Sequence, residues 1–207
     1  MLKTPRTIAF MKNLFDEVVI AGSGPTSFDY NNFCDIHEPV FFINDMHVFA
    51  EICPSEHKYF FTHHPMKYQY VKPIPVHIQR MFVDDSDYQG VLYAHTVPKD
   101  QQYIQIDVKS IDDTIDQSFL DKHKFLLDRD EVAERNMLLA GFGSATTAIH
   151  AAWFAGAKKV TFIGCNPDVE GIQRDPRIGG KLNYGPDLVK ANNRMLPKLL
   201  GLNFIHY

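Results

Sequence analysis

The feature that most constrains this chain is a short apolar run that ends in a glycine-rich turn, reading EVVIAGSGPTS over residues 17–27. The β-branched run predicts a buried strand, and the glycines that follow at once predict a tight turn at its carboxyl end. Gly22 and Gly24 lack a Cβ, so they can adopt positive φ and let a ligand approach the backbone. Such a loop turns N–H groups outward, which suits phosphate. Ser27-Phe28-Asp29 replaces the third glycine of the dinucleotide fingerprint, so a plain strand-to-helix turn is the alternative.

Strand and helix patterns alternate along the rest of the chain. We expect strands at 18–21, 39–44, 59–62, 91–95, 103–106, 159–164 and 203–207, and helices at 110–123, 144–155 and 187–200. Ser144 is the expected N-cap of the Ala-rich helix, and Gly156 its stop signal. Continuous apolar strands separated by helices are typical of a mostly parallel sheet covered on both faces, which predicts a Rossmann-like α/β fold. Residues 1–207 are expected to form one domain, with an irregular insertion or an antiparallel edge around 65–102.

Composition narrows the function classes. The net charge of −4 over 207 residues, with no basic run, argues against a general nucleic-acid binder. The three cysteines are widely spaced and form no C-x-x-C pair, so we expect reduced thiols. No apolar run approaches the ~18 residues of a membrane span, and no signal-peptide pattern opens the chain. We therefore expect a cytoplasmic protein without a transmembrane segment, and the sequence is compatible with a homo-oligomer.

Polar and small residues gather where the expected strands end. In an open α/β sheet, ligands bind outside the carboxyl ends of the strands. The residues that this rule selects are Gly22, Ser23, Gly24, Pro25, Asn44, Asp45, His63, His64, Ser144, Gly164, Cys165, Asn166 and Asp168. Their convergence predicts a ligand pocket at this edge.

Residues 164–186 follow a central strand and alternate glycine and proline with charged side chains. A loop of this length without periodicity is typical of a lid or binding loop. Arg174, Arg177 or Lys181 would then reach a phosphate. A solvated excursion with charges paired among themselves is the alternative.

The third expected strand end carries residue types that can bind a metal ion. Imidazole and carboxylate suit zinc or manganese, and His63 and His64 are followed by Asp84, Asp85 and Asp87. Adjacent side chains at a strand end point in opposite directions, so the two histidines rarely bind one ion. We therefore expect no metal.

Four pieces of the chain resemble the bacterial sialyltransferases of glycosyltransferase family 42. They are the strand followed by GSGP, then VFFIN, then FFTHHP, then GSATTAIHAAWFAGAKKVTFIGCN. The resemblance covers about residues 17–64 and 138–207. A looser resemblance is to Rossmann-like proteins of the motility-accessory-factor and pterin-diphosphokinase group.

The resemblance implies a donor of the CMP-sialic acid type, no cofactor, and a glycan acceptor. The glycine loop would approach the nucleotide phosphate, Asn44 would contact the nucleotide, and Ser144 would face the sugar. His63 or His64 stands where the family has a second polar residue, and Gly164-Cys165-Asn166 stands where it has Gly-x-Asp. These matches give the nucleotide-binding set Gly22, Ser23, Gly24, Pro25, Asn44, Ser144, Gly164 and Asn166.

The chain also departs from that family. The family's general base is a His before the last helix, whereas residues 181–187 read KLNYGPD, and the family Arg before the Ser is absent. A transfer needs a base for the acceptor hydroxyl and groups that neutralise the leaving phosphate. His63, His64 or Asp187 are the candidates for the first role, and Tyr184, Arg174, Arg177 or Lys181 for the second.

The sequence thus predicts a nucleotide-sugar-dependent glycosyltransferase-like protein, with His63, His64 and Tyr184 as candidate catalytic residues. Two alternatives stay open. One is a nucleotide-binding protein without transferase activity, and the other is a diphosphokinase-like enzyme that acts on a small heterocycle.

Overall fold

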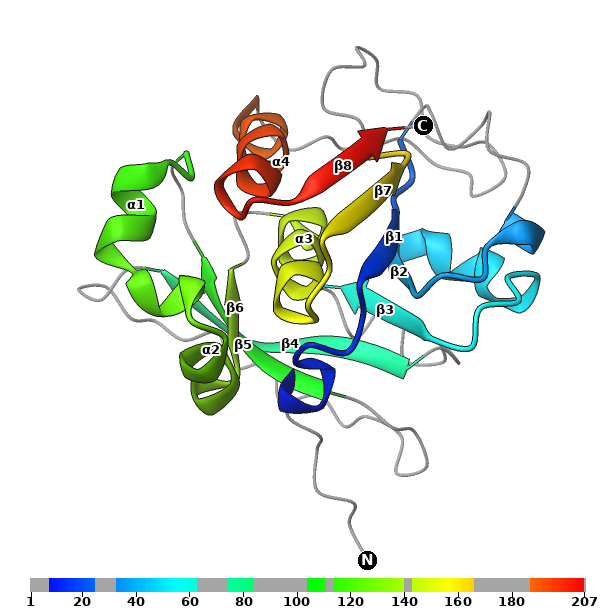
Figure 1. The fold of residues 1–207 in the computed structure, drawn as a ribbon, viewed down its shortest axis with the longest axis horizontal. Helices are drawn as coiled ribbons and strands as arrows, with labels where there is room; N and C mark the ends of the chain where they lie inside the picture. Colours follow the sequence, from blue (N-terminus) through cyan, green and yellow to red (C-terminus); the bar gives the residue numbers. More distant parts are fainter. Residues whose placement is uncertain are drawn as a thin grey trace, which may run out of the picture.

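The chain is built around an eight-stranded sheet in which every neighbouring pair is parallel (Figure 1). The structure is a computed structural model that describes residues 8–24, 33–62, 74–83, 104–110, 114–139, 143–165 and 187–206. The strands are β1 (Glu17–Ala21), β2 (Val40–Ile43), β3 (Lys58–Thr62), β4 (Ile74–Val83), β5 (Ile104–Ser110), β6 (Met137–Leu139), β7 (Lys159–Ile163) and β8 (Asn203–His206). The helices are α1 (Gln117–Lys122), α2 (Arg129–Arg135), α3 (Ser144–Phe154) and α4 (Asp187–Leu199), with short 3-10 helices η1 (Ile8–Met11), η3 (Phe33–Asp35), η4 (Asn44–Glu51) and η6 (Lys124–Leu127).

The order of the strands reverses beside β1. The sheet runs β6-β5-β4-β3-β2-β1-β7-β8, so the chain moves outward from β1 on one side and later returns to its other side with β7. Outward growth from a central first strand, followed by a return on its far side, is the Rossmann arrangement, and the point of reversal lies between β1 and β7. The prediction of a Rossmann-like α/β fold with a parallel sheet is confirmed.

Side chains of β1 alternate between two hydrophobic cores. Val18 and Ile20 belong to the larger core, whereas Val19 and Ala21 belong to the second core on the opposite face. The second core contains Phe33 of η3 and Phe49 of η4, whose rings stack with centroids 4.5 Å apart. Because both faces are covered, the strand is apolar at nearly every position, as its sequence predicts.

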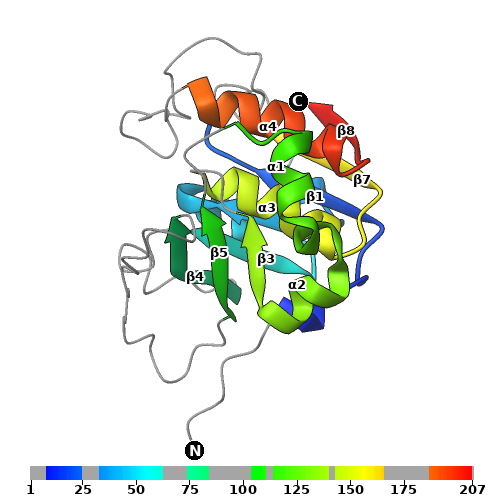
Figure 2. The same cartoon turned by 90° about the vertical axis from the view of Figure 1, so that its left-hand side faces the viewer.

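Helix α3 packs across β1, β2 and β3 and also contacts α4, as Figures 1 and 2 show. It is therefore buried on most sides, and alanines at 148, 151 and 152 let the neighbouring backbones approach closely. Gly156 follows the helix with φ 98°, which confirms it as the stop signal. The prediction for the other end is wrong, because the N-cap is Gly143 in extended conformation and Ser144 is the first helical residue.

Several elements differ from their predicted bounds. The expected helix at 110–123 is the six-residue α1, because Ser110 still belongs to β5 and Asp116 caps the helix by accepting from Phe119 N at 2.8 Å. Residues 74–83, inside the segment expected to be irregular or antiparallel, form β4, which pairs in parallel with β3 and β5. The expected strand at 91–95 lies outside the described residues. No helix in the described part of the chain is long and apolar enough to cross a membrane.

Candidate functional site

The glycine loop after β1 is bonded to the end of β7. The parallel ladder pairs Ala21 with Ile163. It continues past the strand, because Gly22 N donates to Ile163 O at 2.7 Å and Gly24 N donates to Gly164 O at 2.8 Å. The two strands on either side of the reversal point therefore leave the sheet together.

This bonding corrects the expected role of two glycines. Neither Gly22 nor Gly24 has positive φ, and both N–H groups point to β7 rather than outward. The glycine with positive φ at this edge is Gly164, at 62°. Gly22 and Gly24 extend the parallel ladder, so their N–H groups donate to the carbonyls of Ile163 and Gly164. The prediction that these two amides face a phosphate is wrong, whereas ligand contact by the loop itself stays a prediction.

Position 22 has no room for a side chain, because Cys165 lies against it. A Cβ at position 22 would lie 2.2 Å from Cys165 Sγ and 3.0 Å from Gly164 O. Burial raises the pKa of the Cys165 thiol to about 12, although the Gly22 backbone hydrogen bond partly opposes this. The thiol is therefore neutral at physiological pH and serves as a packing group against the glycine loop.

Asn44 begins η4 directly after β2, the strand beside β1. Its φ is 51°, in the left-handed region that asparagine tolerates better than most residues. Its backbone carbonyl accepts from His47 Nδ1 at 2.9 Å. Its side-chain Oδ1 is buried and has no hydrogen-bond donor among the residues that the structure describes. A buried acceptor without a donor costs about 1–3 kcal/mol, so this atom calls for an explanation.

Ser144 stands at the start of α3 and is buried, with 7% of its surface exposed. Because α3 connects the end of β6 to the beginning of β7, it runs antiparallel to the strands, and its first turn lies toward their carboxyl ends. Ser144 therefore lies toward the same edge as Gly24 and Asn44. Gly164 reaches this edge from β7.

A polar link between α3 and α4 was not anticipated from the sequence. Thr146 Oγ1 donates to Asn193 Oδ1 at 2.9 Å, and Asn192, which is fully buried, accepts from Ile115 N at 2.7 Å. These bonds fix the first turn of α3 against α4 and the segment before α1. The sequence signal that could have predicted this link is the pair of adjacent asparagines, Asn192 and Asn193, in an otherwise amphipathic helix.

Ser23 follows β1, Asp45 lies in η4 after β2, and Asp187 begins α4. The other predicted residues lie outside the described part of the chain. They are Pro25, His63, His64, Asp84, Asp85, Asp87, Asn166, Tyr184 and the expected lid beyond Cys165. Among the described residues, no group of three His, Cys, Asp or Glu side chains is arranged to hold a metal ion.

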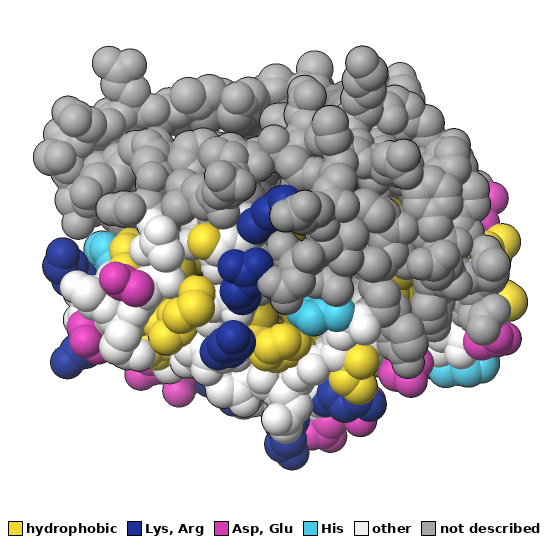
Figure 3. Space-filling view, turned by 90° about the horizontal axis from the view of Figure 1, so that it is seen from above, with side chains coloured by type: hydrophobic (Ala, Val, Ile, Leu, Met, Phe, Trp, Pro, Cys, Tyr) yellow, Lys and Arg dark blue, Asp and Glu magenta, His cyan; other side chains and the backbone are white. Residues whose placement is uncertain are grey.

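Helix α4 carries a stripe of basic residues next to this edge. Lys190, Arg194 and Lys198 recur at four-residue spacing, and Arg194 and Lys198 are exposed. Figure 3, which views the molecule from above Figure 1, shows Lys and Arg side chains on the coloured part of the face that α4 occupies. Since α4 leads by a short turn into β8, it runs antiparallel to the strands, and Lys190 stands nearest their carboxyl ends.

No family model, no curated protein and no solved structure matches this chain. The likeness to sialyltransferases therefore stays an expectation from the residues quoted above.

Proposed function

We propose that the chain binds a nucleotide-linked sugar at the carboxyl edge of the sheet, in the crevice between β1 and β7. The observation that carries the proposal is the reversal of strand order at that point, where the glycine loop and Gly164 leave the sheet side by side. In open α/β sheets this is the position at which ligands bind.

The buried Oδ1 of Asn44 supports a ligand with an N–H or O–H donor at this edge. A nucleotide offers such donors through its ribose hydroxyls and through the exocyclic amine of cytosine. A ligand that donates to Oδ1 would remove the cost of the unpaired acceptor. Lys190 in the first turn of α4 supplies positive charge on the same side of the sheet, which favours a phosphate-bearing ligand.

The donor class that we propose is CMP-linked, and the reaction is transfer of the sugar to a glycan acceptor by direct displacement at the anomeric carbon. The residue resemblance supports this choice through Asn44 and Ser144. Catalysis requires a base for the acceptor hydroxyl, and His63 or His64 are the proposed groups. A nucleotide-binding protein without transfer is the alternative, which the missing family His favours.

Calorimetric titration of the full chain with CMP, ATP and NAD tests the proposal. We expect CMP to bind more tightly than ATP or NAD. We expect Asn44→Gly to weaken CMP binding by about tenfold, because it removes one buried hydrogen-bond acceptor while suiting the local φ. Preferred binding of ATP or NAD would refute the donor class. CMP binding without turnover of CMP-sialic acid at any pH would favour the non-catalytic alternative.

A further inference from the structure

A cavity of about 250 Å³ opens at the opposite, amino edge of the sheet. Its lining residues are Asn13, Leu14, Phe15, Asp16, Arg129, Gly156 and Lys158. Phe15 and Asp16 lead into β1, and Gly156 and Lys158 lead into β7. This cavity is therefore separate from the proposed nucleotide crevice, which lies where the same two strands end.

The backbone walls of the cavity are fixed by hydrogen bonds. Phe15 N donates to Ala155 O at 2.8 Å, and Lys158 N donates to Asp16 O at 2.8 Å. Gly156 has φ 98°, and a Cβ there would lie only 2.9 Å from Asn13 Cα. The two chain segments are thus in close contact, and hydrogen bonds hold the backbone on these sides of the cavity.

Arg129 is a cation without a carboxylate partner in the described part of the chain. Its Nε donates to Trp153 O at 3.0 Å, its Nη1 donates to Asn13 Oδ1 at 3.1 Å, and its guanidinium carbon lies 4.8 Å from the centre of the Trp153 ring. Loss of hydration lowers the pKa of Arg129.

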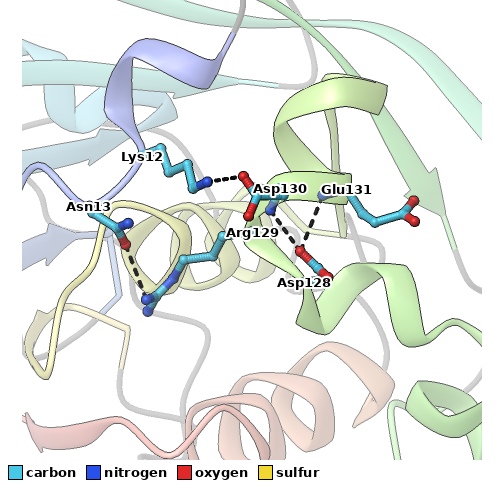
Figure 4. Close-up of polar contacts among 6 residues, drawn as sticks. All are labelled: Lys12, Asn13, Asp128, Arg129, Asp130 and Glu131. Carbon is cyan, nitrogen blue, oxygen red and sulfur yellow. Dashed lines mark hydrogen bonds and ion pairs between the residues drawn. The ribbon is translucent and has the colours of Figure 1, made fainter.

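The two aspartates that flank Arg129 in sequence are engaged elsewhere, as Figure 4 shows. Asp128 caps α2 by accepting from Asp130 N at 2.8 Å and from Glu131 N at 3.3 Å. Asp130 forms an ion pair with Lys12. The guanidinium instead points away from both carboxylates, toward Asn13.

The donors and charges of the cavity suit a small anion. A guanidinium has five N–H donors, and the two contacts with protein oxygen leave three of them for a ligand. Arg129 and Lys158 carry positive charge and Asp16 carries negative charge, so the lining has a net charge of about +1. Lys158 and Asp16 pair at 3.0 Å with side chains 81% exposed, an arrangement that contributes little stability.

Leu14, which is 46% exposed, also lines the cavity and is the exposed aliphatic side chain among its lining residues. A single net positive charge beside an exposed leucine matches a monoanion with a short apolar part better than a multiply charged phosphate. We propose that this cavity binds a small organic monocarboxylate, whose carboxylate pairs with Arg129 and whose apolar part lies on Leu14.

The chain contains its own reporter for this site. Trp153 is its only tryptophan, and Arg129 lies over its ring. Titration with butyrate at constant ionic strength is therefore expected to give a saturable change in tryptophan emission. Butyramide, which has the same shape without the charge, is expected to give no change, and inorganic phosphate is expected to bind more weakly than butyrate.

Charge-changing variants distinguish butyrate binding at this cavity from a non-specific effect of charge on tryptophan emission. Arg129→Gln is expected to weaken butyrate binding by at least about tenfold, since it removes a charged hydrogen-bond donor. Arg135→Gln makes the same change at an exposed residue that pairs with Glu131 at 2.8 Å, and is expected to leave binding unchanged. Lys158→Gln and Asp16→Asn change the rim charge in opposite directions, so the first is expected to weaken binding and the second to tighten it, each about two- to fivefold.

Three outcomes would overturn the proposal: an equal response to butyrate and butyramide, an equal response in Arg129→Gln and the unchanged chain, or a non-saturating response shared by all anions. If Arg129→Gln fails to fold, the Lys158 and Asp16 variants decide the matter, because both change exposed side chains. Equal affinities in those two variants would then refute it.

Discussion

Removing the side chain of Asn44 is expected to stabilise the folded chain. Asn44→Gly deletes a buried Oδ1 that has no donor in the described part of the chain, and an unpaired buried acceptor costs about 1–3 kcal/mol. Glycine also adopts the φ of 51° without strain. Against these gains stands the greater backbone freedom of glycine in the unfolded chain, about 0.5–1 kcal/mol. We expect a net gain of about 1 kcal/mol, which for a chain of this length raises Tm by about 2–4 °C.

Asn136 provides a matched control. Its φ is 50°, nearly that of Asn44, but its Oδ1 accepts from Ile8 N at 2.8 Å. Asn136→Gly makes the same backbone change and loses that hydrogen bond, so it is expected to destabilise by about 1 kcal/mol or more. The two variants differ in whether the deleted oxygen had a donor.

Urea unfolding of both variants, with the chain free of nucleotide, measures the difference. We expect the free energies of unfolding of the two variants to differ by about 2 kcal/mol, with Asn44→Gly the more stable. Equal destabilisation by both changes would refute the reasoning, because it would mean that Asn44 Oδ1 contributes to stability as Asn136 Oδ1 does. A more stable variant that has lost CMP binding is the result expected of a residue kept for its ligand.

Two further predictions concern buried groups. Burial lowers the pKa of His150 to about 4, and the neutral ring donates from Nε2 to Leu126 O at 2.8 Å while Nδ1 accepts from Leu139 N at 3.1 Å. Because this folded pKa lies below the unfolded value near 6.5, the stabilisation is fully present above pH 6.5 and is lost as the pH drops toward 4. The free energy of unfolding is expected to fall by about 2 kcal/mol between pH 7 and pH 5. Urea unfolding should show this extra pH dependence in the unchanged chain but not in His150→Gln, and the same dependence of unfolding free energy on pH in both would contradict the prediction. Gly22→Ala is expected to destabilise by about 1–3 kcal/mol, because its Cβ would meet Cys165 Sγ at 2.2 Å. Adding Cys165→Ala should restore most of that loss in thermal unfolding, and a double variant as unstable as Gly22→Ala alone would show that the thiol is not the obstacle.

The central strands were predictable because their sequences carry a strong local signal. The apolar run at 18–21 is buried on both faces, and Val160, Phe162 and Ile163 are buried in the run at 159–164. A glycine follows or closes each run. Strand β6 was missed because it has only three residues, and α2 was missed because its seven residues present a single fully buried side chain, Val132. Elements this short depend on tertiary packing, which local sequence patterns do not contain.

The site was predicted in position but not in atomic detail. Strand ends could be located from sequence, so Gly24, Asn44 and Gly164 were assigned to one edge of the sheet. Which N–H groups stay available depends on register, and the pairing of Ala21 with Ile163 directs the amides of Gly22 and Gly24 to β7. Register is a non-local property, and a one-residue change would have turned the same amides elsewhere.

The amino-edge cavity was not predicted, because its charges come from distant segments. Arg129 precedes β6 and Asn13 precedes β1, and a hydrogen bond of 3.1 Å joins them across 116 residues. Among the described residues, the carboxyl edge of the sheet thus holds a buried acceptor without a donor at Asn44, and the amino edge holds a cation at Arg129 that bonds to neutral oxygens. A ligand donor would satisfy the first and a ligand anion the second. Because the residues involved share no contact, the two proposals can fail separately: loss of CMP binding in Asn44→Gly should leave the butyrate response unchanged, and Arg129→Gln should leave CMP binding unchanged.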